Sequence, residues 1–299
     1  MAWRTVAITN PARLRVEQGQ LVIGQDEETA LPLEDIAVLL IESPQVLLTA
    51  GTLARLGEHD CLLLVCGEKH TPVLAGLPYA GHSRLSGIHR LQLGTSLPFR
   101  KRCWQRIVRQ KVLNQAECLR LAGCVRWKDV EALADRVASG DSGNIESVAA
   151  RMHFSLLFGE GWWRGGPDGL NGVLDYGYAV LRAAVVRALA AHGLLLTVGL
   201  HHSSELNPFN LADDFLEPLR PAVDLFAAGL KPPPDVLTRE LRIRLVELLG
   251  CEVLVDGKRH SILNACTLVA ASFQAACRHK DPSLLRLPEI FALTEHRYG

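Results

Sequence analysis

Short apolar segments separated by turn-forming residues make up the beginning of the chain. Within 3–42, Val, Ile and Leu are concentrated in the segments WRTVAI, RLRVEQ, QLVIG and DIAVLLIES. The breaks between them fall at Asn10, Pro11, Gly19, Gly24 and Pro32. Short apolar runs with regularly spaced turn residues are typical of an all-β unit. The pattern therefore predicts a small β-sandwich or roll.

One helical segment interrupts this strand pattern. Over 49–59 the leucines have helical spacing, and Thr49 can serve as the N-cap. Strand character returns at 61–66 and 71–76. We therefore expect a β-sandwich domain over residues 1–80. The stretch 81–98 carries Gly, Ser and Pro without clear periodicity, which predicts a linker.

Helical patterns dominate the rest of the chain. Helices are expected over 99–122, 127–138, 144–158, 172–192, 210–228, 234–249 and 261–278. The segment 172–192 is apolar nearly all round, so it is expected at the centre of its domain. Residues 251–261 predict a short hairpin or an extended excursion at Asp256-Gly257. The predicted fold class is α+β, with an N-terminal β-sandwich followed by an all-α-helical catalytic domain over 99–299.

Composition and charge exclude some classes of protein. The chain has 299 residues, of which 48% are apolar and 21% charged, an ordinary globular composition. Its formal net charge of +0 neither supports nor excludes a nucleic-acid partner. There is no convincing transmembrane segment or signal peptide, which predicts a cytoplasmic protein without a membrane partner. The eight cysteines form no Cys-x-x-Cys pair, so zinc fingers are not expected.

The segment GLHHSSELNPFNLADDFLEP, residues 199–218, gathers imidazoles and carboxylates. A helix is expected from about Asn207-Pro208, and Asp214 and Glu217 would then share a face. Carboxylates on one face repel each other unless a cation or hydrogen-bond donors offset them. His202 lies in the loop that enters this helix. The segment is either a metal site or an ordinary helix start, in which first-turn acids such as Asp213 compensate the helix dipole.

Glu146 lies in the first turn of the helix expected over 144–158, which Asn144 can cap. An acid at this position either compensates the helix dipole or serves a functional site. His153 is seven residues later and lies on a similar face. It is an alternative ligand, although a half-buried histidine with satisfied hydrogen bonds is the more ordinary interpretation.

Basic residues cluster at the start of the long helix over 99–122. They are Arg100, Lys101, Arg102, Arg106, Arg109 and Lys111, with Trp104 among them. The i, i+4, i+7 spacing of Arg102, Arg106 and Arg109 places these three along one face. Such a stripe is either a solvated face or a surface that follows a phosphate backbone.

Several dispersed motifs occur in an order that resembles a known family. The stretches MAWRTVAIT, GNIESVAARMHF, LDYGYAVLRA and GLHHSSELNPFNLADDFLEPLRP are similar to those of the CRISPR spacer integrases, most closely the type II branch. This family is the catalytic subunit of the adaptation complex that inserts foreign DNA into CRISPR arrays. The resemblance implies a homodimer, with the N-terminal domain used for dimerisation. It also implies a small second subunit as partner.

The resemblance also implies a catalytic site. By motif matching, Glu146, His202 and Glu217 would be both the catalytic residues and the ligands of Mg²⁺ or Mn²⁺. Asp214 would support the site by orienting its residues, without itself being a metal ligand. The expected DNA-binding residues are Arg100, Lys101, Arg102, Arg106, Arg109, Arg151 and Tyr176. The DNA would be the spacer precursor and the repeat, and the reaction a transesterification by a 3′-hydroxyl, as in a metal-dependent endonuclease or integrase.

The chain departs from the family pattern at two positions. Asp175 stands where a polar amide is usual, and His153 stands where an aromatic ring is usual, so their roles are open. Two other functions compete with the integrase. A non-catalytic DNA-binding scaffold of the same complex would keep the basic stripe without needing a metal. A small-molecule metalloenzyme is the other, but a di-iron bundle would normally show Glu-x-x-His on facing helices, which is missing from the helices expected here.

Overall fold

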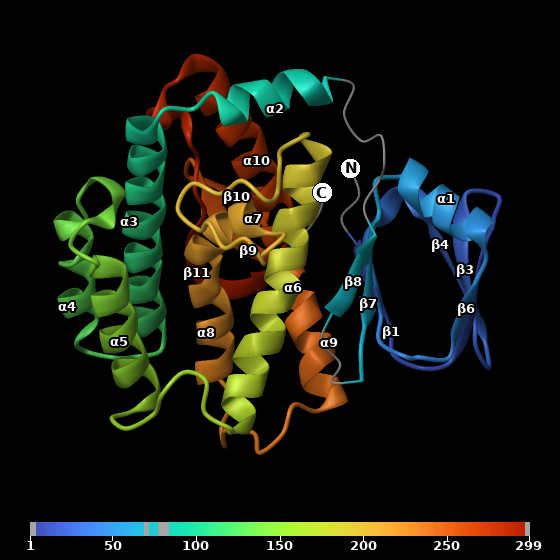
Figure 1. Ribbon diagram of the computed structural model, residues 1–299. Coiled ribbons are helices and arrows are strands. Elements are labelled where there is room, and N and C mark those ends of the chain that lie inside the picture. Colours follow the sequence, from blue (N-terminus) through green and yellow to red (C-terminus); the bar gives the residue numbers. More distant parts are fainter. Residues whose placement is uncertain (1–3, 69–71, 77–83, 297–299) are drawn as a thin grey trace. The chain divides into compact units, whose positions relative to one another are not determined.

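The computed structural model describes residues 4–68, 72–76 and 84–296. The chain divides into two compact units, Met1–Ser83 and Arg84–Gly299. Strands form the first unit and helices dominate the second (Figure 1), so the predicted α+β class is confirmed.

The first unit contains two four-stranded sheets. The strands are β1 (Arg4–Ile8), β2 (Ala12–Glu17), β3 (Gln20–Gly24), β4 (Glu28–Pro32), β5 (Ile36–Ile41), β6 (Val46–Leu48), β7 (Leu62–Cys66) and β8 (Pro72–Gly76). One sheet has the order β1-β5-β7-β8 and the other β4-β3-β2-β6. β1, β5 and β7 pair in parallel, whereas β8 pairs antiparallel with β7. The sequence did not predict β4 or β6 as separate strands.

Apolar side chains from both sheets meet in one core, which confirms the β-sandwich. Leu14 and Leu21 from one sheet and Leu39 from the other belong to the same buried cluster. All six residues of β5 are buried, and burial on both faces explains its uninterrupted apolar sequence. The Thr49 hydroxyl accepts a hydrogen bond from the backbone N–H of Thr52, and so caps α1 (Ala50–Glu58) as predicted.

The second unit contains nine α-helices among its described residues. They are α2 (Leu85–Leu93), α3 (Leu97–Leu121), α4 (Trp127–Glu131), α5 (Ile145–Phe158), α6 (Gly169–Ala191), α7 (Asn210–Leu216), α8 (Arg220–Ala228), α9 (Arg239–Glu247) and α10 (Ile262–His279). A short 3₁₀ turn, η4 (Glu217–Leu219), joins α7 to α8. The unit also holds β9 (Cys251–Val255), β10 (Lys258–Ser261) and β11 (Glu289–Glu295).

The three-stranded antiparallel sheet corrects the prediction that this unit is all-α-helical. β9 and β10 are the expected hairpin, and β11 pairs with the other edge of β9. β11 was missed because its partner is far away in sequence, and local pattern carries no information about that pairing. The predicted linker, 81–98, also contains regular structure within its described residues. Its stretch Leu85–Leu93 is the helix α2, which buries Ile88 and Gln92.

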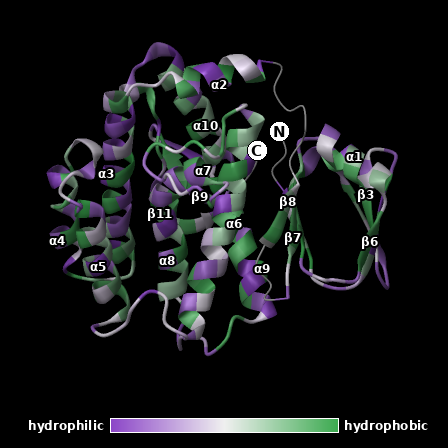
Figure 2. Ribbon diagram, in the orientation of Figure 1, coloured by the Kyte–Doolittle hydropathy of each residue, from purple (hydrophilic) through white to green (hydrophobic). Residues whose placement is uncertain are grey.

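Helices α3 and α6 organise the second unit. α6 is buried over most of its length, as predicted, and packs against α7, α8, α9 and α10. Figure 2 shows α6 as mainly hydrophobic, whereas α3 is more mixed. At Gly177, a Cβ atom would lie 2.5 Å from Val223 Cγ1, so only glycine permits this close approach to α8. α3 packs against α5, η4 and α8. No helix among the described residues has both the length and the apolar character that a membrane span requires.

Candidate functional site

A buried carboxylate holds the loop that carries the two adjacent histidines. Asp214 on α7 is completely buried, and it accepts hydrogen bonds from three successive backbone N–H groups. Leu200 N lies 2.5 Å and His201 N 3.3 Å from Oδ2, and His202 N lies 3.1 Å from Oδ1. At Gly199, a Cβ atom would lie 2.8 Å from the same Oδ2, so the loop can close on Asp214 only with glycine there.

Asp214 also orients the His202 ring. His202 Nδ1 lies 2.8 Å from Asp214 Oδ1, which leaves Nε2 as the ring nitrogen turned away from this bond. The hydrogen bond that His202 donates to Asp214 raises the pKa of His202, against the opposing effect of partial burial. The adjacent His201 has a different environment, because its ring stacks on Trp104 with centroids 4.4 Å apart. His202 rather than His201 is therefore the histidine held by an acid.

Glu217 is buried between two cationic side chains. Its Oε1 accepts a hydrogen bond of 2.8 Å from Arg220 Nε, and its Oε2 lies 2.5 Å from Lys111 Nζ. Burial alone would raise the pKa of Glu217, but the charges of Lys111 and Arg220 outweigh it and lower the pKa to about 2. Glu217 is therefore a carboxylate at neutral pH.

Glu146 reaches the same place from α5. Its Oε1 accepts a hydrogen bond of 2.7 Å from Lys111 Nζ. Asn144 does not cap this helix, because it has a positive φ of 50° and its side chain makes no capping bond. Asp141 has that role instead: its carboxylate accepts from Ile145 N at 2.9 Å and from Glu146 N at 3.0 Å. The predicted cap was wrong because a turn before α5 brings the earlier acid to the helix end.

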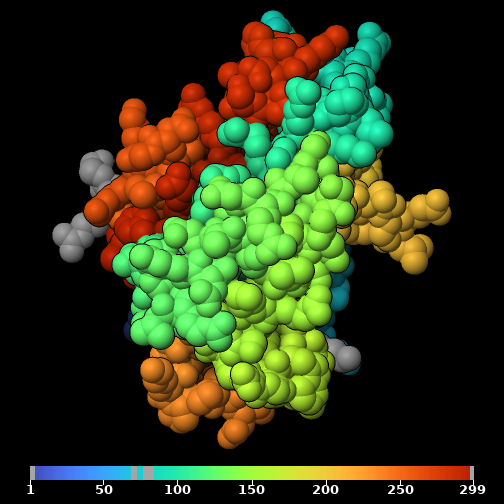
Figure 3. All heavy atoms as spheres, turned by 90° about the vertical axis from the view of Figure 1, so that its left-hand side faces the viewer, coloured from blue at the N-terminus to red at the C-terminus, as the bar shows by residue number. Residues whose placement is uncertain are grey.

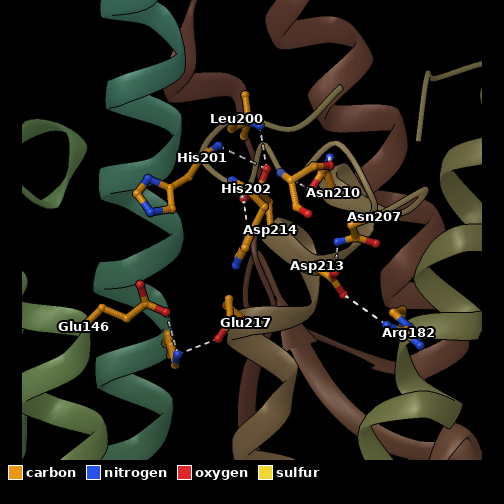
Figure 4. Close-up of polar contacts among 12 residues, drawn as sticks. Glu146, Arg182, Leu200, His201, His202, Asn207, Asn210, Asp213, Asp214 and Glu217 are labelled. Carbon is orange, nitrogen blue, oxygen red and sulfur yellow. Dashed lines mark hydrogen bonds and ion pairs between the residues drawn. The ribbon is translucent and has the colours of Figure 1, made fainter. Parts of the chain in front are cut away.

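The structure thus brings Glu146 and Glu217 together around Lys111, with the His202 loop beside them (Figure 4). No group of three or more His, Cys, Asp or Glu side chains in the described part of the chain is arranged to hold a metal ion. The Lys111 ammonium, however, already contacts one oxygen of each carboxylate. Two carboxylates and an imidazole are suitable donors for Mn²⁺ and Mg²⁺. The donor set therefore fits a cation, provided that Lys111 gives way.

The predicted DNA-binding residues differ in exposure and in the bonds that they already make. Arg100 lines a pocket of about 650 Å³ together with His202. Lys101, Arg102 and Arg151 are exposed, the last of them on α5. Arg106 donates to the carbonyl of Leu285 at 2.9 Å, and Arg109 pairs with Asp135 at 3.1 Å. These last two guanidinium groups are also exposed, but they are already bonded within the chain.

The structure does not support the prediction that Tyr176 binds DNA. Its side chain is only 1% exposed and packs within the core of the second unit, so it cannot contact DNA in this arrangement. The reason is the phase of α6: the position lies on the helix face that packs inward, which local pattern did not reveal in a helix that is apolar nearly all round. The DYGY motif therefore has a packing role at this tyrosine.

The two positions that depart from the family pattern also have defined partners. His153 is completely buried, and its Nε2 lies 3.0 Å from Asp224 Oδ2. Tyr178 OH donates to the other oxygen of the same carboxylate. His153 is therefore bonded in the core, and is not an alternative ligand at the site. Asp175 forms an ion pair with Arg164.

Four residues at the site were not predicted from the sequence as site residues. They are Trp104, Lys111, Asp141 and Arg220. Lys111 belongs to the basic cluster, but it is seven residues from the buried Trp104 and so lies on the inward face of α3. That spacing could have separated it from the exposed arginines. Arg220 carries a similar signal, because it stands three residues after Glu217 on a helical turn.

Comparison with known proteins assigns this chain to a family. The family model for CRISPR associated protein Cas1 matches residues 146–231, which include all three predicted ligands. The CRISPR-associated endonuclease Cas1 of Neisseria meningitidis is 44% identical over 303 residues, covering 100% of both chains. A Cas1 of Pyrobaculum aerophilum is 32% identical over 160 residues, covering 46% of this chain and 53% of that one. The chain belongs to the Cas1 family of CRISPR-associated endonucleases, which confirms the predicted family; the type II branch stays a prediction.

Solved structures agree on the fold. A Cas1 protein from Thermotoga maritima has a TM-score of 0.71 at 15% identity, covering 92% of this chain and 97% of that chain. A casposase bound to an integration product has a TM-score of 0.73 at 16% identity, covering 94% of this chain and 92% of that chain. At these identities the likeness concerns the architecture alone. It extends over both compact units.

Proposed function

We propose that this protein is a metal-dependent DNA integrase that inserts spacer DNA into CRISPR arrays. The observation that carries the proposal is the convergence of Glu146 and Glu217 on one buried cation beside His202. These residues come from α5, η4 and the loop before α7, so the tertiary fold alone brings them together. They also lie within the segment that matches the Cas1 family model.

In the proposed reaction, the 3′-hydroxyl oxygen of a spacer strand forms a bond to the phosphorus of a repeat phosphodiester. The bond from that phosphorus to the 3′-oxygen of the repeat strand breaks, and this oxygen takes up a proton as the attacking hydroxyl loses one. When bound, Mg²⁺ or Mn²⁺ would polarise the phosphodiester and offset the charge that develops on its oxygens. Glu146, His202 and Glu217 would hold that ion.

The remaining residues prepare this site. Asp214 accepts from His202 Nδ1 and fixes the ring, so that Nε2 is available as a ligand when the ring is neutral. Arg220 keeps Glu217 ionised and in place. Arg100, which lines the same pocket as His202, and the exposed Lys101, Arg102 and Arg151 would hold phosphates without reading sequence.

The proposed partners are the spacer precursor and repeat DNA, a second copy of this chain, and a small second subunit. Solved structures of similar fold support the first and last of these. They include a Cas1–DNA complex at a TM-score of 0.52 and a Cas6-RT-Cas1–Cas2 complex at 0.71. The 44% identical relative is itself described as an endonuclease. A non-catalytic scaffold role is the competing outcome of the test.

The test is strand transfer into a supercoiled plasmid that carries a repeat. Wild-type protein, with and without a small second subunit, is incubated with a short duplex in Mn²⁺, Mg²⁺ or EDTA. A matched duplex with 3′-dideoxy ends lacks the attacking hydroxyl and serves as substrate control. His202→Ala and Glu217→Ala are compared with Arg126→Ala, which removes an exposed arginine paired with Asp129.

We expect metal-dependent joining by the wild type and by Arg126→Ala, and none with the dideoxy duplex. Joining by His202→Ala and Glu217→Ala should fall by at least about 100-fold, as for the loss of a charge-stabilising group at a reacting centre. DNA binding without joining, unchanged by either substitution, would favour the scaffold. Absence of DNA binding would contradict both the integrase and the scaffold. The small-molecule metalloenzyme would then be the favoured function.

A further inference from the structure

The cation that lies between the two carboxylates of the site is a lysine side chain of the protein. Lys111 is only 8% exposed, although lysine is among the residues least often buried. Its Nζ lies 2.7 Å from Glu146 Oε1 and 2.5 Å from Glu217 Oε2. Figure 4 shows the two bridged residues, Glu146 and Glu217, below the His202 loop. The ammonium thus lies where two of the three proposed metal ligands meet.

This bridge explains how the site is assembled without a metal. Glu146 and Glu217 come from different elements, and two unpaired carboxylates this close together, one of them buried, would repel each other or become protonated. Lys111 on α3 offsets both charges at once, because α3 packs against α5 as well as η4. The ligands are therefore held in place by an internal ion, and metal binding is not needed to bring them together.

The same bridge makes the addition of a metal alone unfavourable. Lys111 and Arg220 together carry two positive charges. These offset the two negative charges of the Glu146 and Glu217 carboxylates. A divalent cation added to this balanced cluster would lie next to the ammonium and leave an excess of positive charge in a poorly solvated place. A phosphodiester brings negative charge to the same place. Cation and phosphate together are therefore accommodated better than either one alone.

We infer that Lys111 is a resident counterion that couples metal binding to DNA binding, so that the site binds its divalent ion tightly only when a phosphodiester is present. Such a device would keep the metal-loaded centre from forming away from its substrate. The inference rests on the proposed function, because it takes Glu146, His202 and Glu217 as the metal ligands. In this role Lys111 is a positioning residue that acts through the two carboxylates.

Isothermal titration of Mn²⁺ into the full-length protein tests the coupling. Titrations are made without DNA and with a duplex whose 3′ ends are dideoxy, so that no strand transfer occurs. For the wild type we expect at least tenfold tighter Mn²⁺ binding with the duplex. In Lys111→Met the ammonium is lost at similar length, and Mn²⁺ binding without DNA should tighten at least tenfold. Lys111→Arg keeps the charge and should keep the coupling.

Other outcomes would overturn the inference. If folded Lys111→Met gains no Mn²⁺ affinity without DNA, or shows the wild-type gain on adding DNA, Lys111 has only a structural role. If Lys111→Met does not fold, the coupling is tested with the wild type alone, by measuring its duplex affinity with and without Mn²⁺. This is possible because coupling between two ligands is reciprocal. Mn²⁺ must then tighten duplex binding by the same factor, and an unchanged duplex affinity contradicts the inference.

Failure of the underlying metal site gives a different result. Glu217→Gln should abolish Mn²⁺ binding both with and without DNA. If it binds Mn²⁺ as the wild type does, the ion binds elsewhere and the proposed site is wrong, whatever Lys111→Met shows. If Glu217→Gln loses binding but Lys111→Met leaves the coupling intact, the metal site stands and the Lys111 inference alone fails.

Discussion

His202 Nδ1 lies 2.8 Å from Asp214 Oδ1, and the same buried carboxylate accepts from the backbone N–H groups of Leu200, His201 and His202. One side chain therefore fixes both the path of the loop and the direction of the ring. This arrangement makes Asp214 a structural requirement of the site as well as a partner of the histidine.

Replacing Asp214 should destabilise the protein. Asp214→Asn puts an amide N–H₂ group among backbone donors, so at least one buried donor loses its acceptor. We expect the free energy of unfolding in urea to fall by roughly 2–4 kcal/mol. The control is Asp213→Asn, because that neighbour is less buried and bonds to Asn207 at 2.6 Å. An equal effect of both substitutions would contradict a special role for Asp214.

The His202 ring should titrate above its ordinary pKa of 6.5, because Asp214 stabilises the protonated ring. A folded-state pKa above the unfolded value means that this interaction stabilises the fold fully below pH 6.5 and is lost as the pH rises through the raised pKa. NMR titration of the imidazole C–H signals, assigned by comparison with His202→Gln, measures it. A His202 pKa at or below 6.5 would show that the Asp214 bond is not maintained in solution.

Glu217 should contribute to stability in the opposite pH direction. Its pKa is lowered to about 2, so the stabilisation is present above the ordinary value of 4.5 and is lost as the pH falls towards 2. At pH 7 we expect Glu217→Gln to lose about 3 kcal/mol in the free energy of unfolding, because Lys111 and Arg220 are left without a carboxylate. The difference from the wild type should shrink below pH 4.5. A difference independent of pH would mean that the charge of Glu217 is not the cause.

The exposed and buried members of the predicted DNA surface should behave differently. Arg102→Ala should weaken duplex binding and reduce the slope of log affinity against log salt by about 1, as expected for one lost phosphate contact. Tyr176→Phe should leave both unchanged, since this side chain is buried. Fluorescence anisotropy over a range of salt concentrations measures these effects. A loss of affinity in Tyr176→Phe as large as that in Arg102→Ala would indicate that the tyrosine becomes exposed on binding.

Asp141 should support Glu146 through the end of α5. Asp141→Ala removes acceptors for Ile145 N and Glu146 N, and the loss of such a cap costs about 1–2 kcal/mol. Urea unfolding measures this loss. Asn144→Gly is the control, because Asn144 makes no capping bond to α5 and glycine tolerates its positive φ of 50°. A larger effect of the Asn144 substitution would reverse the assignment of the cap.

The sequence by itself determined the elements whose signals are local. Thr49 caps α1 as predicted, and the uniformly apolar pattern of 172–192 placed α6 at the centre of its unit. Such elements are predictable because capping and amphipathic periodicity act between residues that are close in the chain. Motif resemblance proposed Glu146, His202 and Glu217 as site residues, and the Cas1 relatives confirm the family that the resemblance named.

Only the tertiary structure decided which residues meet. β11 pairs with β9 across a long stretch of chain, and Lys111 reaches Glu146 and Glu217 because α3 packs against two separate elements. Neither contact leaves a periodic trace, because it depends on packing between segments far apart in sequence. Burial also depends on the tertiary structure. Tyr176 is buried and does not lie on the DNA-binding surface predicted for it. Lys111, which the sequence grouped with exposed basic residues, is buried as the counterion of two carboxylates.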